Sequence, residues 1–365
     1  MAWRVKIYWP AALSFLVAGA YAVSRLSAGG WNPLSLATVG NSLQTGQPWS
    51  EQGYDGQFTY AIAIDPDPSR VAEHLDVPAY RYQRILLPLV ARALALGQAT
   101  GIPWALLFVN LAAHTLGTAA VVRLVVDREL KEGFAITYGL WVGLVAGVGL
   151  DLAEPLAFAL IASGWLLRSR GRTALGNLAL GLSLFAKETS ILFLVAALVS
   201  DWFEGRRGGV LGAGALSIGA FVLWQIWLWR VFGSPGLASG GDRATPFEII
   251  PFLGLLRVGS VSMKALGLYL VVFGPTIVAP AVWACLTALR GLRFGQRSAE
   301  TWSLLFQGAS IAFLPFSTFR EPLGLVRFAS GLVVGTLFYA SLVKHRRALA
   351  YGLLWTALLA ILFNS

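Results

Sequence analysis

Long apolar runs separated by short polar segments fill the chain from its start to its end. Several runs are shorter than the ~20 residues that an upright helix needs to cross a membrane. The pattern predicts an all-α polytopic membrane protein, a single transmembrane domain over residues 1–365 with about 11 transmembrane helices. We expect these helices over residues 7–26, 102–126, 134–150, 152–167, 174–186, 189–203, 209–231, 263–289, 299–317, 323–343 and 348–363.

Composition supports the membrane assignment. Hydrophobic residues make up 56% of the chain and charged residues only 13%, whereas soluble domains carry about a quarter charged residues. The formal net charge of +10 does not require a nucleic-acid partner, because basic residues of membrane proteins collect in cytoplasmic loops. Cys285 is the single cysteine, so an internal disulfide is excluded.

Basic clusters occur at every second boundary between the apolar runs. Placing all of them in the cytoplasm predicts a plasma (inner) membrane protein with an inside amino terminus and an outside carboxyl terminus. The first run is then an uncleaved helix rather than a signal peptide. The clusters are Arg4/Lys6, Arg123/Arg128/Lys131, Arg168/Arg170/Arg172, Arg206/Arg207, Arg290/Arg293/Arg297 and Lys344/Arg346/Arg347.

Two segments of the core region 102–231 begin and end at such clusters. Residues 134–167 and 174–203 are therefore predicted to enter the membrane and return as short hairpins. Their bends, "GLDLAEPL" and "FAKETS", hold Asp151 and Glu154, and Lys187 and Glu188. Because ionisable groups are costly in hydrocarbon, they are expected to face a wet cavity or a partner. For Lys187 and Glu188, a structural turn at the interface is the alternative.

The first extracytoplasmic loop, residues 27–84, mixes carboxylates with aromatic rings. Rings stack on sugar faces while carboxylates hydrogen-bond or deprotonate hydroxyls, so the loop suits a carbohydrate. An ordinary aromatic belt at the membrane interface explains the same mixture equally well. The residues are Glu51, Asp55, Asp65, Asp67, Glu73, Asp76, Trp31, Trp49, Tyr54, Tyr60, Tyr80 and Tyr82.

Residues 79–97 are predicted to form one amphipathic helix that lies on the outer leaflet and completes the loop region 27–100. At 100° per residue, Arg81, Arg84 and Arg92 share one narrow face. Arginine binds phosphate through its planar fork, so this face is a candidate lipid-phosphate clamp. Adhesion to anionic headgroups is the alternative reading.

Metal and nucleotide signals are weak. Asp65 and Asp67 in "DPDP" are weak candidates for a shared divalent cation, although a proline-punctuated turn is preferred. The three histidines, His74, His114 and His345, lack metal-ligand spacing relative to one another. No glycine-rich nucleotide-binding signature follows an expected strand.

"YDGQFTYAIA" resembles the segment after the first helix in the GT-C superfamily of membrane glycosyltransferases, above all the glycosylphosphatidylinositol mannosyltransferase branch and related bacterial proteins. Tyr54-Asp55, Phe58 and Ile62-Ala63 match its pattern, with the aromatic displaced by one position and Tyr54 in place of a common Trp. "YQRILLPLVARALA", "AEPLAFAL", "FAKETSILF" and "FREPLGLVRF" are similar to later elements of that branch.

The resemblance implies an inverting transfer of a hexose, with mannose as one candidate, from a polyprenyl-phosphate carrier. The acceptor is a lipid, glycan or protein on the extracytoplasmic face. Asp55 is the expected general base. Arg84, Lys187, Arg320 and Arg327 are the expected cations for the donor phosphate, and the remaining substrate-binding candidates are Tyr54, Gln57, Tyr82, Arg81, Glu154, Glu188 and Glu321.

Two other classes of function stay open. Charges near membrane depth, proline breaks and 40 glycines also suit a transporter or flippase, and a scaffold without chemistry predicts that Asp55 is dispensable. The outer loop 232–262 is glycine-rich, and we expect it to cover the site or to select the acceptor. The C-terminal helices occupy residues 263–365.

Overall fold

The computed structural model describes residues 7–40, 53–206, 208–241 and 244–363. This part of the chain is helical and contains no β-strand, which confirms the all-α prediction. Some residues named above lie outside the described ranges, namely Arg4, Lys6, Trp49, Glu51 and Arg207.

Within these ranges, six helical segments are long and apolar enough to cross a membrane. Two further helical segments meet at 54° and make a seventh candidate span if they are counted together. They are η2–α10 (Glu132–Ala135, Ile136–Gly139) and α11 (Val142–Gly149). The six are α2 (Trp9–Ala28), α9 (Ile102–Asp127), α15 (Gly209–Phe232), α17–η5–α18 (Met263–Phe273, Gly274–Val278, Ala279–Arg293), α21–α22 (Pro322–Phe328, Ser330–Leu342) and α23–η6–α24 (Arg346–Gly352, Leu353–Leu359, Ala360–Phe363).

The remaining apolar runs form helices that are too short for an upright span. They are α12 (Glu154–Ser169), α13 (Thr173–Ser183), α14 (Ile191–Phe203) and α19 (Ala299–Ala312). At 1.5 Å per residue, even the 16 residues of α12 reach only about 24 Å, less than the ~30 Å hydrocarbon core. The prediction of about 11 spans is therefore not confirmed, and the supported count is six or seven candidate spans.

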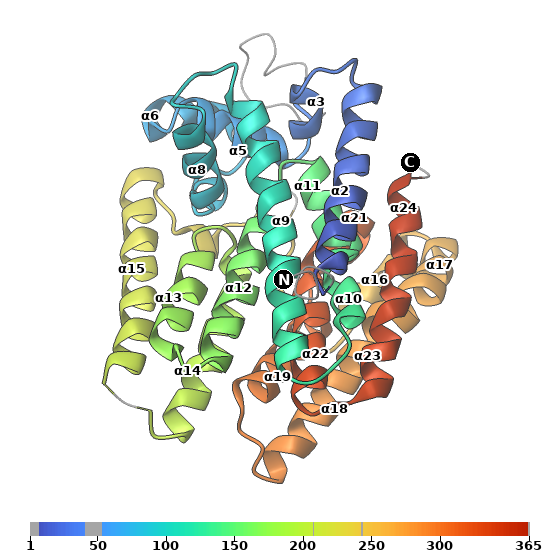
Figure 1. Ribbon diagram of the computed structural model, residues 1–365. Coiled ribbons are helices and arrows are strands. Elements are labelled where there is room, and N and C mark those ends of the chain that lie inside the picture. The colour runs from blue at the N-terminus through green and yellow to red at the C-terminus, as the bar shows by residue number, and fades with distance from the viewer. Residues whose placement is uncertain (1–6, 41–52, 207, 242–243, 364–365) are drawn as a thin grey trace.

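The chain bends at both predicted hairpin positions. One bend separates α11 from α12, which pack against each other, and the other separates α13 from α14. The second bend includes the short helix η3 (Glu188–Ser190). Figure 1 shows α12, α13 and α14 beside α9 and α15, below the layer that carries α5 and α8.

That layer is built from short helices at one end of the molecule (Figure 1). In chain order they are α3 (Leu34–Ala37), α5 (Gly56–Ile64), α6 (Pro68–Val71), η1 (Ala72–His74), α7 (Pro78–Tyr82) and α8 (Leu86–Leu94). The later segments η4 (Gly236–Ala238), α16 (Leu253–Val261) and α20 (Phe316–Arg320) complete the described elements. The region 27–100, predicted as an outer loop with interfacial helices, thus contains several short helices.

The single amphipathic helix predicted over residues 79–97 is wrong. The chain forms α7 and α8 with a break between them, because Pro88 has no N–H and is tolerated only in the first turn of a helix. Arg81, Arg84 and Arg92 consequently point to different partners instead of sharing one face. Arg92 donates to the backbone oxygens of Ala63 and Ile64, where α5 ends.

The "DPDP" segment forms a capped turn. The Asp67 carboxylate accepts a hydrogen bond from the Ser69 N–H at 2.9 Å, and this bond starts α6. Asp65 pairs with Arg70 at 2.8 Å. Both carboxylates therefore have local structural partners.

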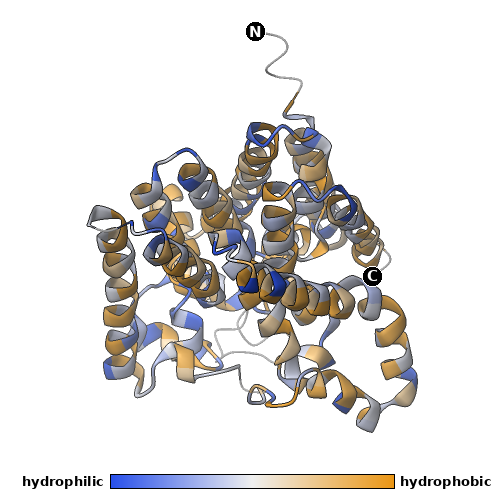
Figure 2. Ribbon diagram, turned by 90° about the horizontal axis from the view of Figure 1, so that it is seen from below, coloured by the Kyte–Doolittle hydropathy of each residue, from blue (hydrophilic) through white to orange (hydrophobic). Residues whose placement is uncertain are grey.

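Hydrophobic residues dominate the helices at the rim of the molecule as well as those inside (Figure 2). On α15, Leu216, Leu223 and Trp229 are each more than half exposed. A membrane protein needs such an apolar exterior, because lipid tails rather than water surround it. Inside, a continuous core joins α2, α9, α11, α12 and α22.

A buried ion pair fastens the ends of the short helices opposite the α5–α8 layer. Arg168 of α12 binds Asp201 of α14 through both terminal nitrogens, at 2.8 and 2.9 Å. Asn177 of α13 donates to the same carboxylate and to the Val210 carbonyl at the start of α15. The Asp201 side chain is fully buried. Its carboxylate joins three helices, and Asn177 connects them to a fourth.

We expect Asp201→Ala to lower the free energy of unfolding by about 3–5 kcal/mol, because it leaves Arg168 buried without its partner. Thermal unfolding of the detergent-solubilised protein measures the loss. Arg170→Ala is the matched control, since Arg170 is 44% exposed in its pair with Asp127 and should cost less than about 1 kcal/mol. Equal losses in the two variants would contradict the central role of Asp201.

Candidate functional site

The position of Asp55 depends on the glycine that follows it. A Cβ at Gly56 would lie 2.3 Å from the Leu150 carbonyl oxygen and 2.9 Å from that of Ala37. Only glycine permits such a close approach of backbone to backbone. The start of α5 is thereby held against the α11–α12 bend, and Asp55 lies beside Leu152, Ala153 and Glu154 in one cavity.

A second close approach positions Arg327. A Cβ at Gly143 of α11 would lie 2.5 Å from the Val326 carbonyl oxygen of α21. The two helices therefore pack with backbones nearly in contact, and Trp141 adds a hydrogen bond to Ser330 at 2.9 Å. Arg327, buried on α21, reaches the same cavity as Asp55 although 272 positions separate them in the sequence.

The two oxygens of Asp55 bind two different arginines. Oδ1 accepts from Arg81 Nη1 and Oδ2 from Arg327 Nη1, each at 2.8 Å. Arg81 Nε and Nη2 also donate to Oδ1 and Oδ2 of Asp76, both at 2.7 Å. Burial alone would raise the pKa of Asp55, but the guanidinium groups of Arg81 and Arg327 outweigh burial and hold that pKa well below its usual range.

Glu154 and Lys187 join the two predicted hairpins. Lys187 Nζ donates to Glu154 Oε1 at 2.6 Å, and Arg327 Nε donates to the same oxygen at 2.8 Å. The Glu154 side chain is only 1% exposed, so the carboxylate depends on these two cations for its charge to be stable. The charged bends thus pair with each other across the hairpins.

Arg84 forms the third cation–carboxylate unit. It binds both oxygens of Glu188, at 2.8 and 2.7 Å, and donates to the Tyr80 hydroxyl. A backbone hydrogen bond from Leu86 to the Phe185 carbonyl, 2.9 Å long, fixes the start of α8 against the α13–α14 bend. That bond brings Arg84 next to Glu188.

The network is balanced in charge. Four carboxylates, Asp55, Asp76, Glu154 and Glu188, face four cations, Arg81, Arg84, Lys187 and Arg327. Tyr54 extends it, since its hydroxyl accepts from Arg327 at 2.9 Å and donates to Glu321 at 2.8 Å. The cavity at the centre has a volume of about 20 Å³, enough for about one water molecule.

The structure brings together most, but not all, of the expected site residues. Asp55, Arg81, Arg84, Glu154, Lys187 and Arg327 line the cavity, and Tyr54, Glu188 and Glu321 bind members of the network. Five candidates lie elsewhere. Gln57 is buried and accepts from the Gly40 N–H, Tyr82 packs among Trp224, Trp227 and Phe232, Arg320 is exposed beside Phe316, and Asp65 and Asp67 form the turn before α6.

Asp76 is the site residue that sequence reasoning placed in the loop without a role. Its side chain is 7% exposed and holds Arg81, and Val77 N–H donates to it as well. The signal that could have found it is the spacing of five residues between Asp76 and Arg81 across the start of α7. Thr59 and Phe58, one turn after Asp55, also line the cavity.

Asp151 differs from its predicted partner Glu154. Its side chain is fully buried, and within the described residues neither carboxylate oxygen has a hydrogen-bond partner. Burial raises the pKa of Asp151 well above its usual range, and Asp151 is not among the ion-paired carboxylates of the network. The φ angle of 50° at Asp151 makes the tight turn between α11 and α12.

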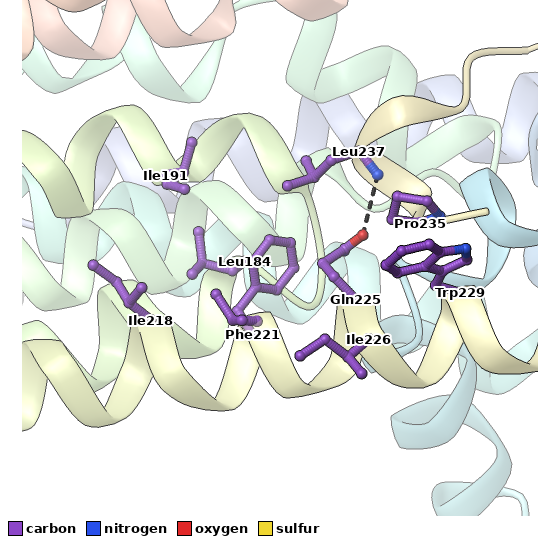
Figure 3. A pocket seen from close by; sticks show the side chains of 10 residues that line it. Leu184, Ile191, Ile218, Phe221, Gln225, Ile226, Trp229, Pro235 and Leu237 are labelled. Carbon is purple, nitrogen blue, oxygen red and sulfur yellow. Dashed lines mark hydrogen bonds between the residues drawn. The ribbon is translucent and has the colours of Figure 1, made fainter.

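An apolar groove lies beside the α13–α14 bend (Figure 3). It has a volume of about 200 Å³, and Leu184, Ile191, Ile218, Phe221, Ile226 and Trp229 form much of its lining. Leu184 and Ile191 flank the bend that carries Lys187. The one polar side chain, Gln225, accepts a hydrogen bond from the Leu237 N–H at 3.1 Å.

No family model, curated protein or solved structure matches this chain. The likeness to the GT-C superfamily therefore remains a prediction from the sequence motifs.

The Arg84–Glu188 pair is expected to be energetically coupled. Arg84→Ala and Glu188→Ala should each lower the free energy of unfolding by about 3 kcal/mol, since each leaves a charge that is only 14% exposed without its partner. The double variant should cost about 2 kcal/mol less than the sum of the two.

A double-mutant cycle by thermal unfolding in detergent measures this coupling. The exposed pair Arg70–Asp65, with side chains 68% and 34% exposed, is the matched control and should couple by less than about 1 kcal/mol. Strict additivity at Arg84 and Glu188 would show that the pair is not a structural unit.

Proposed function

We propose that this chain is a membrane glycosyltransferase that moves a hexose from a polyprenyl-phosphate carrier to a hydroxyl group of a lipid, glycan or protein. The observation that carries the proposal is the meeting of one partly exposed carboxylate, Asp55, with four cations in a single cavity. These are the two kinds of group that the reaction needs at one place.

In the proposed reaction, the acceptor oxygen forms a bond to C1 of the sugar while the bond from C1 to the phosphate oxygen breaks. The electron pair leaves with the phosphate, and Asp55 takes the proton of the acceptor hydroxyl. Attack on the face opposite the phosphate inverts C1. Fixed cations stabilise the charge that develops on the leaving phosphate, and a positioned carboxylate assists proton transfer.

The cations best placed for the phosphate are Arg81, Arg84, Lys187 and Arg327, which line the cavity. Arg320, expected from the sequence to join them, is exposed at the end of α20. Tyr54 and Glu321 border the cavity on the side of α21 and are candidates to contact the sugar or the acceptor.

The apolar groove supports a carrier with a hydrocarbon tail. Its lining is hydrophobic, and it begins at the bend whose Lys187 reaches the charge network. A chain lying in the groove would place its polar head near that bend. The outer segment 236–241 lies close by, since a Cβ at Gly241 would be 3.7 Å from Arg81 Nη2, which suits the expected role of this loop at the site.

We expect Asp55→Asn to abolish transfer, because no other carboxylate that lines the cavity is more than 1% exposed. The measurement is mass spectrometry of envelope glycolipids and glycans from a deletion strain complemented at matched membrane levels. Loss of one hexose that only the natural sequence restores supports the enzyme. Restoration by both proteins would instead favour a transporter or flippase.

A matched pair of arginine variants tests the phosphate assignment. Arg327→Ala should raise the KM for the donor by tenfold or more, on the order expected for the loss of a charged contact. Arg320→Ala should change it less than about twofold, since Arg320 lies outside the cavity. Equal effects of the two substitutions would overturn the assignment of Arg327.

The site is proposed to face the extracytoplasmic side of the plasma membrane, with the amino terminus in the cytoplasm. In a Cys285→Ser background, a cysteine at Gln98 should react with a membrane-impermeant maleimide on intact cells. A cysteine at Glu204, at the opposite end of the molecule, should react only after permeabilisation. The reverse pattern would invert the proposed orientation.

A further inference from the structure

Every cation of the charge network already has a carboxylate partner. Arg81 binds Asp55 and Asp76, Arg84 binds Glu188, and Arg327 and Lys187 share Glu154. Because the four positive and four negative charges balance, a further anion would leave the cavity with a net negative charge. An anion therefore binds well only if a carboxylate gives up its cation.

Space leads to the same conclusion. The cavity of about 20 Å³ holds about one water molecule, whereas a phosphodiester has five heavy atoms in its phosphate group alone. A phosphate can reach the arginines only when a side chain that now occupies their forks moves away.

Asp55 is the carboxylate that can leave most easily. Its side chain is 26% exposed, compared with 7% for Asp76 and 1% for Glu154. Each oxygen of Asp55 binds one nitrogen of a different arginine, whereas Asp76 occupies two nitrogens of Arg81 and accepts from the Val77 N–H. If Asp55 moves towards its exposed side, it is the carboxylate that gives up the fewest protein contacts, because it is the most exposed of the three.

We propose that Asp55 occupies the place of the donor's phosphate when no donor is bound, and that the phosphate displaces Asp55 from the clamp formed by Arg81 and Arg327. This inference rests on the proposed function and adds a control step to it. The phosphate takes over the two arginines, and the released carboxylate becomes available to the acceptor hydroxyl. Donor binding thereby precedes, and switches on, the base.

The exchange resolves a conflict at Asp55. A carboxylate held between two guanidinium groups is a poor base, because its pKa lies far below the operating pH. Once the phosphate neutralises Arg81 and Arg327, these two guanidinium groups no longer hold the pKa of Asp55 down, and that pKa rises towards its ordinary range. The protein then exposes an effective base only when the donor is present, so the acceptor is deprotonated only beside a sugar that can receive it.

The test is equilibrium binding of farnesyl methyl phosphate, a phosphodiester with one charge over the whole pH range, to the purified full-length protein. We expect Asp55→Asn to bind this probe roughly tenfold more tightly than the natural protein, because it removes the competitor for the clamp. Glu73→Gln removes one negative charge outside the clamp, from a side chain that is 70% exposed, and should change the affinity less than about twofold.

The dependence of binding on pH gives a second, independent readout. Exchange raises the pKa of Asp55 in the bound state, so binding takes up a proton, and the affinity of the natural protein rises as the pH falls from 6 towards 4. The natural protein and Asp55→Asn share the other ionisable groups around position 55, which are Tyr54, Arg81, Arg84, Glu154, Lys187, Glu188 and Arg327. The difference from Asp55→Asn therefore isolates Asp55.

The outcomes separate the two proposals. Tighter binding by Asp55→Asn than by Glu73→Gln, with pH profiles of Asp55→Asn and the natural protein that converge towards acid, supports the exchange. Equal affinities with parallel profiles overturn the exchange and leave the proposed transferase standing. Absence of probe binding by both the natural protein and Asp55→Asn overturns the phosphate site, and with it both proposals. Asp55→Ser serves in the same test if Asp55→Asn does not fold.

Discussion

The cost of burying charge is the constraint on which this structure depends. At the depth of a membrane no bulk water is available, so a charged side chain is stable only beside an opposite charge or several polar partners. The protein meets this requirement with ion pairs that join segments far apart in the sequence, such as Arg168 with Asp201 and Arg327 with Glu154. These pairs connect helices too short to be stable spans by themselves, and they fix where the two hairpins lie.

The same requirement shapes the candidate site. Cations gathered in one cavity without counter-charges would repel one another and lose hydration, and carboxylates from the chain pair with them. Asp55 satisfies Arg81 and Arg327, an arrangement that stabilises the fold but opposes the role of base proposed for Asp55. Stability and chemistry therefore make opposite demands on one carboxylate, and the proposed exchange with a phosphate satisfies each demand in turn.

Sequence reasoning worked where a local rule has a clear physical cause. Hydrophobicity marks helices that face lipid, and the bends with Glu154 and Lys187 were found because charges interrupt apolar runs. It failed where the length of a helix or a contact between distant segments decides the structure. Runs such as 174–186 and 299–317 are apolar, yet α13 ends at Ser183 and α19 at Ala312, and neither helix is long enough for an upright span. Residues 79–97 have a helical pattern, but the helix breaks at residues 83–85, just before the turn that holds Pro88. Arg81 and Arg84 then bind different carboxylates.

The sequence by itself determined the class of this protein, an all-helical membrane protein, because composition and periodicity follow directly from the solvent that surrounds each helix. It also determined which residue types are available for chemistry. Only the tertiary structure decided which of them meet. Asp55, Glu154, Lys187 and Arg327 come from four separate segments, and the close backbone approaches at Gly56 and Gly143 bring these segments together. No local pattern encodes such an approach, because it depends on the shapes of two elements at once.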